Sequence, residues 1–262
     1  VSKDANHLIE EFMLLANRKV AEFIGKQKKT FIYRVHDEPN DDKLFGLQNI
    51  ISKFGYKLDL RNKKDISKSL NQLMQDVNGK KEQNLVDTLA IRTMSKASYS
   101  TDNIGHYGLG FTHYSHFTSP IRRYPDLMTH RMLLDFLHNK KQGNPTKVED
   151  EAKWCSSREL IASRAQRDSI KYKQAEYLQD KIGKVFTGIV SGVTDWGLYV
   201  ELTESKCEGM IRYQSLEGNY SIDTQNYRIF NDTGDTIRLG DEITIIVNGV
   251  DLEKKQIDFI KM

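Results

Sequence analysis

The stretch KVFTGIVSGVTDWGLYVELTESKCEGMIR, residues 184–212, decides the fold of the C-terminal part of the chain. Short apolar runs rich in Val and Ile are separated by Gly, Asp and Ser, which is the pattern of β-strands joined by turns. The predicted strands cover residues 185–193, 197–202, 207–213, 242–250 and 256–260. Five short strands with Gly at their turns suit a small closed barrel, such as the oligonucleotide-binding fold. The longer, more polar stretch 217–238 is interpreted as an inserted loop.

The part of the chain before residue 182 shows a different pattern, because apolar residues recur there at helical spacing. Helices are predicted at about residues 6–24, 44–54, 66–77, 85–94, 120–138 and 148–181, with an extended segment at 31–36. A polar loop is expected at Gln142–Pro145, and Ser119 is expected to be the N-cap of the helix that starts at Pro120. The predicted fold class is therefore α+β, with a mainly helical domain at residues 1–181 and a five-stranded barrel at 182–262.

The composition is that of a soluble globular protein: of 262 residues, 38% are hydrophobic and 29% are charged, with a net charge of +3. No run of about 18 apolar residues is present, so the sequence predicts no membrane span, and it shows no secretion signal. Cys155 and Cys207 lie far apart and form no metal-type pair, which favours a reduced, cytoplasmic chain. The chain begins with Val1 rather than Met and enters a helical pattern at once, so we expect a piece of a longer protein.

The densest group of chemically active residues reads HYGL at 106–109, YSHFTSPIRRYPD at 114–126 and then His130. Arg122 can hold phosphate oxygens in a bidentate fashion, and the free N–H groups after Ser119 favour an anion. Stacking faces for unpaired bases are offered by Tyr107, Tyr114, Phe117 and Tyr124. Together these residues predict a phosphate site for single-stranded nucleic acid.

Two other interpretations fit the same residues. An aromatic strand followed by a Ser-Pro helix start is a common arrangement of core and cap, with no ligand. Alternatively the histidines form a metal site, although no cysteine is near and their spacing matches no familiar helix-borne site. The histidines concerned are His106, His113, His116 and His130. The residue types alone leave all three interpretations open.

Position by position, the run 106–130 resembles the signature of the catalytic domain of the ribonuclease II family of exoribonucleases, the RNB domain. The segments HLIEEFM at 7–13 and RVHDEP at 34–39 agree, and the resemblance is closer to ribonuclease R than to ribonuclease II. It covers nearly the whole chain, and it implies that residues 1–181 are the C-terminal half of an RNB domain. The implied activity is hydrolysis of RNA from its 3′ end, one nucleotide at a time, by a two-metal mechanism that yields nucleoside 5′-monophosphates.

The resemblance also implies roles for individual residues. Arg122 matches the arginine that reaches the scissile phosphate in the family, where it would offset developing charge. A glutamate of the first helix helps to hold the terminal nucleotides, and Glu10 or Glu11 matches it; the alternative for both is an exposed acidic helix turn. Further RNA contacts are expected from Tyr114, Ser119, Arg123 and Tyr124.

The metal ligands of the family are the part that the sequence lacks. Two-metal hydrolysis needs several carboxylates around two Mg²⁺ ions, which the family places in one compact acidic motif. Asp41-Asp42 is the only adjacent pair of aspartates, and helix capping explains it. We therefore expect the ligands upstream of Val1, Mg²⁺ in the full-length enzyme and no metal in this chain. The chain is predicted to bind RNA without degrading it.

The terminal barrel resembles an S1 RNA-binding domain through DWGLYV at 195–200 and EGMIR at 208–212. Trp196 and Tyr199, on adjacent strands, would offer stacking platforms; the alternative is that they cap the end of the barrel. Arg212 stands where the family commonly has His, and Lys254 or Lys255 would contact the RNA backbone. Since phosphate contacts release counterions, binding should weaken steeply with added salt.

Three functions of different classes remain open. The first is part of a processive 3′→5′ exoribonuclease that acts on single-stranded RNA. The second is a non-catalytic RNA-binding module that acts through the barrel while the helical region is an inert platform. The third is a structural adaptor that docks through the charged helix 148–181, although a charge run is usually a solvated face. The sequence indicates no membrane contact and no obligate protein partner.

Overall fold

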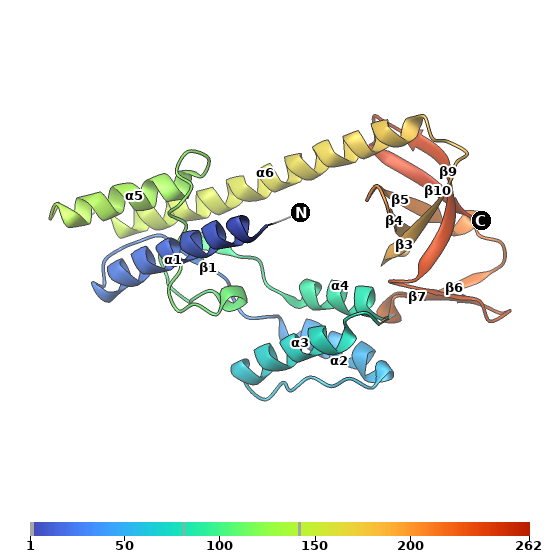
Figure 1. Ribbon diagram of the computed structural model, residues 1–262, viewed down its shortest axis with the longest axis horizontal. Coiled ribbons are helices and arrows are strands. Elements are labelled where there is room, and N and C mark those ends of the chain that lie inside the picture. Colours follow the sequence, from blue (N-terminus) through green and yellow to red (C-terminus); the bar gives the residue numbers. More distant parts are fainter. Residues whose placement is uncertain (1–2, 81, 141–142) are drawn as a thin grey trace. The chain divides into compact units, whose positions relative to one another are not determined.

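The computed structural model describes residues 3–80, 82–140 and 143–262 (Figure 1). The helices are α1 (Asp4–Lys26), α2 (Asp41–Ile51), α3 (Lys63–Val77), α4 (Gln83–Thr93), α5 (Tyr124–Leu137) and α6 (Pro145–Gln179). The strands are β1 (Tyr33–Val35), β2 (Ser98–Ser100), β3 (Val185–Val193), β4 (Gly197–Leu202), β5 (Glu208–Arg212), β6 (Tyr220–Asp223), β7 (Arg228–Asn231), β8 (Thr236–Arg238), β9 (Glu242–Asp251) and β10 (Gln256–Lys261). The predicted α+β fold class is confirmed.

The chain folds into two compact units, Val1–Asn40 with Met94–Ser163 and Asp41–Thr93 with Arg164–Met262. The domain boundary predicted between residues 181 and 182 stays a prediction. Within the expected polar loop, Gln142 lies outside the described residues, and Pro145 is already the first residue of α6. Across the described ranges, no helix combines the length and the apolar character needed to cross a membrane.

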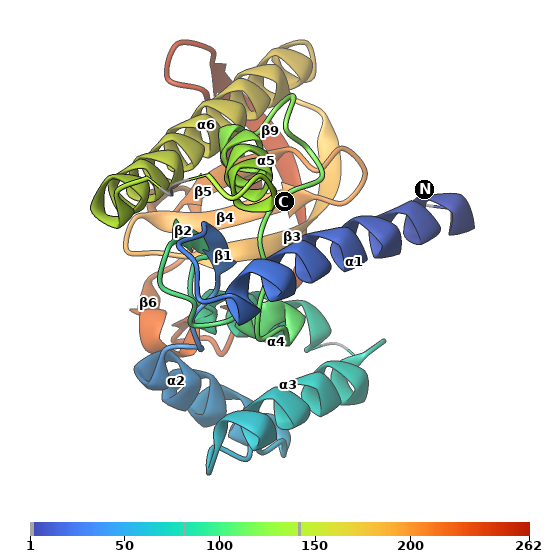
Figure 2. The same ribbon diagram turned by 90° about the vertical axis from the view of Figure 1, so that its left-hand side faces the viewer.

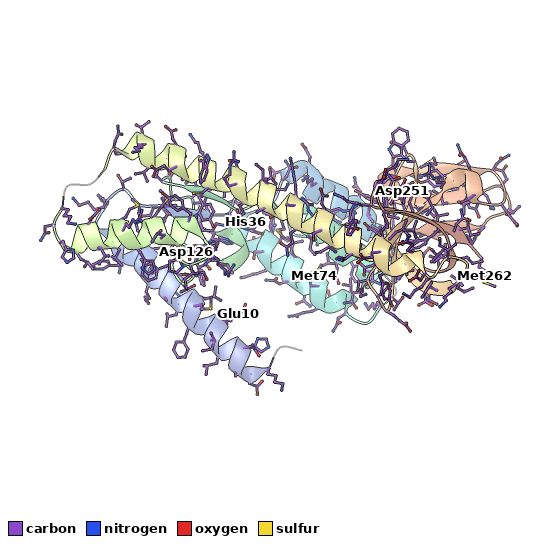
Figure 3. All side chains as sticks on the ribbon, turned by 90° about the horizontal axis from the view of Figure 1, so that it is seen from above. Glu10, His36, Met74, Asp126, Asp251 and Met262 are labelled. Atoms are coloured by element: carbon purple, nitrogen blue, oxygen red, sulfur yellow. The ribbon has the colours of Figure 1, made fainter. Side chains whose placement is uncertain are left out.

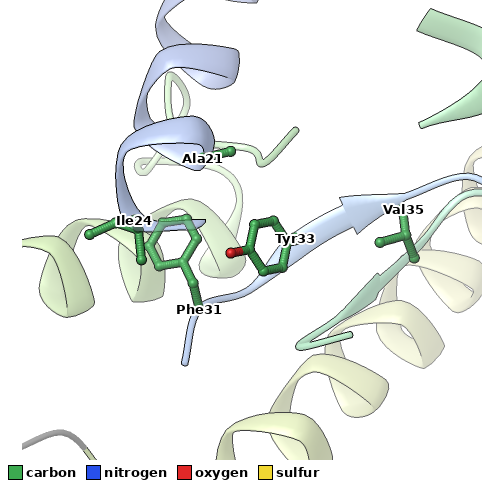
Figure 4. Packing of buried hydrophobic residues seen from close by; sticks show 5 residues of the cluster. All are labelled: Ala21, Ile24, Phe31, Tyr33 and Val35. Atoms are coloured by element: carbon green, nitrogen blue, oxygen red, sulfur yellow. The ribbon is translucent and has the colours of Figure 1, made fainter. Parts of the chain in front are cut away.

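The core of the first unit lies between α1, the extended segment around β1 and α5. Side chains alternate between the two faces of an extended segment, so every second residue points the same way. The buried residues that meet on one face are Ala21, Ile24, Phe31, Tyr33 and Val35 (Figure 4). Partly buried side chains of α5 cover them. The extended segment predicted at residues 31–36 therefore forms the centre of this unit.

The opposite face of β1 packs toward α6. Ile32 lies there in a second buried cluster with residues of β2, α5 and α6. Next to it, Arg34 binds both carboxylate oxygens of Glu159, at 2.6 and 3.0 Å, and its guanidinium carbon lies 4.6 Å from the centre of the Tyr99 ring. Planar bidentate pairing of this kind ties an arginine firmly to one position. It holds β1 to the first half of α6.

Helix α1 departs from the amphipathic pattern predicted for it. Ile9 and Phe12 belong to the predicted apolar stripe, yet they are 58% and 60% exposed. The buried positions are Asn17, Ala21 and Ile24, all in the C-terminal half of the helix. Periodicity shows which side chains share a face but not how far along the helix that face is covered.

The second unit combines a helical layer with the barrel. Helices α2 and α3 both pack against α4 (Figure 2). The barrel closes in the order β10-β5-β4-β3-β9, with β10 parallel to β5 and the other neighbours antiparallel. Gly197 is required where β4 passes β5, because a Cβ at this position would collide with the carbonyl oxygen of Ile211. The five predicted strands and the closed barrel are confirmed.

The insertion within the barrel is ordered, which corrects the predicted loop at 217–238. Strands β6, β7 and β8 form an antiparallel sheet of their own, with Ile222 opposite Ile229 and Ile229 opposite Ile237. Ile229 is fully buried. Polar residues dominate the rest of the segment because the strands are short, so the apolar alternation spans too few residues to be recognised.

Candidate nucleic-acid interface

The residues SPIRR at 119–123 form a turn rather than the start of a helix. The Ser119 carbonyl oxygen accepts hydrogen bonds from the backbone N–H groups of Arg122 at 3.3 Å and Arg123 at 3.0 Å. Helix α5 begins only at Tyr124, with Arg123 as its N-cap. The prediction of Ser119 as N-cap and of Pro120 as the first helical residue is therefore wrong.

Asp126, on α5, is the physical reason for this turn (Figure 3). Its side chain is fully buried, and Oδ1 accepts hydrogen bonds from the Ser119 backbone N–H and from Nη2 of Arg123, both at 2.8 Å. A buried carboxylate needs such partners because removing a charge from water is costly. The carboxylate therefore draws residues 119–123 back over the first turn of α5.

The two arginines of the turn have different surroundings. The side chain of Arg123, a predicted RNA contact, is only 22% exposed, and its guanidinium group already forms an ion pair with Asp126. Arg122 is exposed, and its side chain has no hydrogen-bond or ion-pair partner among the described residues. The turn thus presents a free guanidinium group, the side-chain group best suited to bidentate phosphate binding.

A second anchor for this region comes from α1. Asn17 is buried, and its Oδ1 accepts hydrogen bonds from the backbone N–H groups of Phe117 at 2.9 Å and Thr118 at 3.2 Å. Its Nδ2 donates to the hydroxyl of Tyr114 at 3.2 Å. These bonds fasten residues 114–118 to the helix. Sequence reasoning missed Asn17, because a lone polar residue on a helix gives no signal of partners 100 residues away.

The aromatic residues predicted to stack on bases lie in unlike environments. Tyr114 is 5% exposed, so its ring offers little surface for stacking on a base, and its contact with RNA stays a prediction. Phe117 is stacked on His130, with ring centroids 3.8 Å apart. Tyr124 is 47% exposed and meets the Trp154 ring edge to face at 6.3 Å. Tyr124 is therefore the better placed of the predicted tyrosines.

Two of the histidines, His106 and His116, are half-buried and neutral. Burial lowers the pKa of His116 to about 3 and that of His106 to about 4, and neighbouring basic groups add to both shifts. Nδ1 of His116 bonds with the hydroxyl of Tyr99 at 2.8 Å, and burial raises the pKa of Tyr99 to about 12. Within residues 3–80, 82–140 and 143–262, no group of three or more His, Cys, Asp or Glu side chains is placed to hold a metal ion.

Buried polar atoms without a hydrogen-bond partner among the described residues concentrate in this part of the first unit. They are Nδ1 of His106, Oγ1 of Thr118, Nε of Arg123 and Oδ2 of Asp126. Such atoms are uncommon in folded proteins and each one calls for an explanation. Their concentration favours a functional role for the residues around the Ser119–Arg123 turn over a purely structural role.

The two glutamates of the first helix lie in its exposed part. Glu10, labelled in Figure 3, and Glu11 are both exposed, and Nδ1 of His7 lies 4.0 Å from a carboxylate oxygen of Glu10. An exposed acidic turn is the arrangement that the structure shows. Contact of either residue with RNA stays a prediction.

On the barrel, the predicted RNA contacts come from turns as well as strands. Trp196 is 78% exposed and lies in the turn between β3 and β4, not on a strand as predicted, because β4 begins at Gly197. Tyr199 is half-buried on the outer face of β4. Arg212, at the end of β5, lies 3.4 Å from a carboxylate oxygen of Asp258. Lys254 is exposed in the turn that precedes β10.

Comparison with known families decides the identity of the fold. The family model of the RNB domain matches residues 1–139, and that of the S1 RNA binding domain matches residues 179–261. The chain belongs to the RNB-domain family. The predicted family and the predicted type of barrel are therefore confirmed.

Curated relatives of this RNB-domain chain are named ribonuclease R. The protein of Aquifex aeolicus is 36% identical over 260 residues, and that of Thermotoga maritima is 38% identical over 264 residues. These alignments cover 97% and 98% of this chain but 37% of each relative. The protein of Escherichia coli is 33% identical over 270 residues, which are 98% of this chain and 33% of the relative. The chain thus spans about a third of the length of the curated relatives that it matches.

Solved structures agree with this family. RNase R of Mycoplasma genitalium in complex with ribose methylated single-stranded RNA is 26% identical, with a TM-score of 0.88, and the match covers all of this chain and 42% of that one. The apo form of the same protein matches with a TM-score of 0.87 over the same shares of both chains.

Proposed function

We propose that this chain is the RNA-holding part of a processive 3′→5′ exoribonuclease of the ribonuclease R type, which hydrolyses RNA to nucleoside 5′-monophosphates. One observation carries the proposal: a turn held by the buried carboxylate of Asp126 presents the free guanidinium group of Arg122. The names of the relatives support the activity, and the RNA in the Mycoplasma genitalium complex supports the substrate class.

The role of Arg122 follows from its chemistry. A guanidinium group can donate two parallel hydrogen bonds to one phosphate and keeps its charge at every physiological pH. Negative charge grows on the scissile phosphate during hydrolysis, and a fixed cation there lowers the barrier without having to move. Because the turn is fastened at both Ser119 and Arg123, the backbone on each side of Arg122 is already placed before RNA arrives.

Mg²⁺ would supply the activated water and the Lewis acid in the complete enzyme. The residues of this chain do not fit such a site, since the described ranges contain no group of three or more possible ligands. Asp41 and Asp42 lie in the first turn of α2, where carboxylates stabilise the positive end of the helix. We therefore propose that the chain by itself binds RNA and does not degrade it.

A binding and turnover assay on the purified 262-residue chain tests this. A 5′-labelled single-stranded RNA is titrated by fluorescence anisotropy and then incubated with Mg²⁺ while mononucleotides are separated. We expect binding that weakens steeply between about 50 and 200 mM salt, because phosphate contacts release counterions. No mononucleotide should form. Robust Mg²⁺-dependent release of 5′-monophosphates would contradict the proposed inactivity, and an affinity that ignores salt would contradict backbone contacts.

A non-catalytic RNA-binding module is the second candidate, favoured by the lack of a metal-type group among the described residues beside a barrel of the S1 type. The full-length protein separates the two candidates. There, Arg122→Ala should lower kcat by about 100-fold or more, as loss of one preorganised charge contact does, with little change in RNA affinity. Arg131→Ala removes the same charge from an exposed position on α5 and serves as the control. Equal losses of affinity and turnover in Arg122→Ala would favour the binding module.

We also propose that the protein works in the cytoplasm. Cys155 and Cys207 are both buried and unpaired, as expected in a reducing compartment. Cell fractionation with markers for each compartment tests this, and recovery of the protein with secreted or periplasmic markers would contradict it.

A further inference from the structure

A pocket of about 340 Å³ lies in the second unit, where the C-terminal half of α6 meets the barrel. Its volume is at the lower end of the range of small-molecule sites. Strands β4, β5 and β10 supply the floor, and α6 supplies one wall. Figure 1 shows this end of α6 lying beside the barrel strands. The RNA contacts predicted for this unit all lie on the barrel, and none lies on α6.

The floor is a row of three neighbouring side chains. Tyr199 of β4 is the partner of Met210 in β5, and Met210 is the partner of Asp258 in β10. Residues directly opposite on adjacent strands point to the same face. Each of the three is half-buried and lies between buried residues of its own strand, so the row is on the outside of the barrel.

The wall is held in place against this row. Nε2 of Gln174 donates to the carbonyl oxygen of Lys206 at 2.7 Å, and Nζ of Lys255 lies 3.5 Å from a carboxylate oxygen of Asp168. Further along the helix, Ala175 and Leu178 are fully buried. Polar links and apolar burial together fix the register of α6 on the barrel, so the pocket is formed before any ligand binds.

The polar groups at the pocket favour a neutral ligand over a phosphate. The carboxylate of Asp258 already pairs with Arg212 at 3.4 Å, and one oxygen of Glu208 accepts a hydrogen bond from Ser191 at 2.7 Å. Both carboxylates keep further acceptor positions, and they would repel an anion. Two lysines of the lining are already paired, Lys254 with Asp251 at 3.4 Å and Lys255 with Asp168 at 3.5 Å. The faces of the Tyr199 ring and the Met210 thioether suit a flat, apolar surface instead.

Helix α6 adds polar groups that can form hydrogen bonds with the edge of such a ligand. Lys171 and Gln174 are three residues apart and so share one face of the helix. Lys171 is exposed and has no ion-pair partner within the part of the chain that the structure describes. Gln174 donates through Nε2 and retains its amide oxygen as an acceptor. A single nucleobase needs a flat surface for its ring and hydrogen-bond donors and acceptors for its edge. This small pocket offers both.

We propose that this pocket binds one unstacked nucleobase of single-stranded RNA. Lys171 and Gln174 of α6 contact the edge of the base. The carboxylates of Glu208 and Asp258 favour a base with an exocyclic amino group over uracil. Carboxylates accept well from the amino group of cytosine, for which uracil has a carbonyl oxygen instead. The inference rests on the proposed RNA binding of the chain and names the base class that one subsite of it prefers.

The experiment measures the affinity of the 262-residue chain for fluorescein-labelled oligocytidylate and oligouridylate of equal length. Lys171→Gln and Gln174→Ala are compared with Lys173→Gln, which removes the same charge from the same helix but outside this pocket, where Lys173 pairs with Glu176 at 2.6 Å. We expect oligocytidylate to bind about fivefold more tightly than oligouridylate, and Glu208→Gln to lose most of that difference because the carboxylate that accepts from the amino group is gone. Lys171→Gln and Gln174→Ala should weaken the binding of both oligonucleotides, and Lys173→Gln should leave both affinities nearly unchanged. Circular dichroism confirms that all variants are folded.

The outcomes separate the pocket from the proposed function. Equal effects of Lys171→Gln and Lys173→Gln would show that only overall charge matters, and equal binding of the two oligonucleotides by the parent chain would refute the base preference; either result overturns the pocket while RNA binding stands. Failure of the parent chain to bind either oligonucleotide at low salt would overturn both the pocket and the proposed function.

Discussion

Replacement of Asp126 by asparagine tests the central structural argument, that one buried carboxylate holds the Ser119–Arg123 turn. The side chain is fully buried and Oδ1 receives two hydrogen bonds of 2.8 Å, one of them from a guanidinium group. Hydrogen bonds to a charged group contribute about 1.5–3 kcal/mol each. Breaking a buried ion pair by removing one partner costs about 3–5 kcal/mol. Asparagine keeps one acceptor oxygen, so we expect Asp126→Asn to lower the free energy of unfolding by about 3 kcal/mol.

The assay must report on the first unit alone. The chain has two tryptophans, Trp154 in the first unit and Trp196 in the second, so a Trp196→Phe background leaves Trp154 as the only fluorescent tryptophan. Urea unfolding followed through Trp154 then gives the stability of that unit. Asp135→Asn is the matched control, since Asp135 also lies on α5 but is 48% exposed and pairs with Lys140 at 3.3 Å.

Exposed ion pairs contribute about 0–1 kcal/mol, so the control should change the unfolding free energy little. A double-mutant cycle with Arg123→Gln isolates the pair itself, and neighbouring residues in one network typically show coupling of about 0.5–3 kcal/mol. If Asp126→Asn unfolds at the same urea concentration as Asp135→Asn, or if the cycle shows no coupling, the carboxylate does not hold the turn and the reasoning fails.

Three further predictions follow from other parts of the molecule. Burial lowers the pKa of His116 to about 3, below its value in the unfolded chain, so unfolding takes up a proton at acidic pH. The free energy of unfolding of the first unit should therefore decline from about pH 6.5 downward. His116→Gln should make this decline shallower between about pH 7 and pH 5. Gly197→Ala should destabilise the barrel by about 1–3 kcal/mol because its Cβ would collide with the Ile211 carbonyl oxygen, whereas Gly249→Ala, with open space around it, should leave the melting temperature nearly unchanged. Tyr124→Ala should weaken binding of single-stranded RNA by about 1 kcal/mol or more if its exposed ring stacks on a base, and an unchanged dissociation constant would remove it from the interface.

Local pattern in the sequence determined the elements and the family. The strands at 185–193 and 197–202 were predicted at their observed bounds, because alternating burial and Gly at the turns depend only on near neighbours. The helices were placed within a few residues for the same reason. The run 106–130 carried enough constrained positions to indicate the family that the comparisons then showed.

Tertiary structure alone decided how the candidate site is built. Nothing near Ser119 in sequence shows that its N–H belongs to the buried carboxylate of Asp126, which delays the start of α5 to Tyr124. Nor does the sequence around Tyr114 reveal that a side chain of α1, Asn17, holds its hydroxyl in the core. Each of these facts depends on which distant groups remove a polar atom from water, and that is settled by packing rather than by periodicity.

The same distinction applies to the arginine and the barrel. The sequence determined that Arg122 is the residue suited to a phosphate, because only the identity of its guanidinium group was needed. Only the folded chain shows that the Arg122 side chain has no hydrogen-bond or ion-pair partner among the described residues. Only the folded chain shows that its neighbour Arg123 forms an ion pair with Asp126. Likewise Tyr199 was a candidate from its position in the S1 pattern, but the pocket that it shares with α6 exists because the helix packs against strands that follow it in the chain.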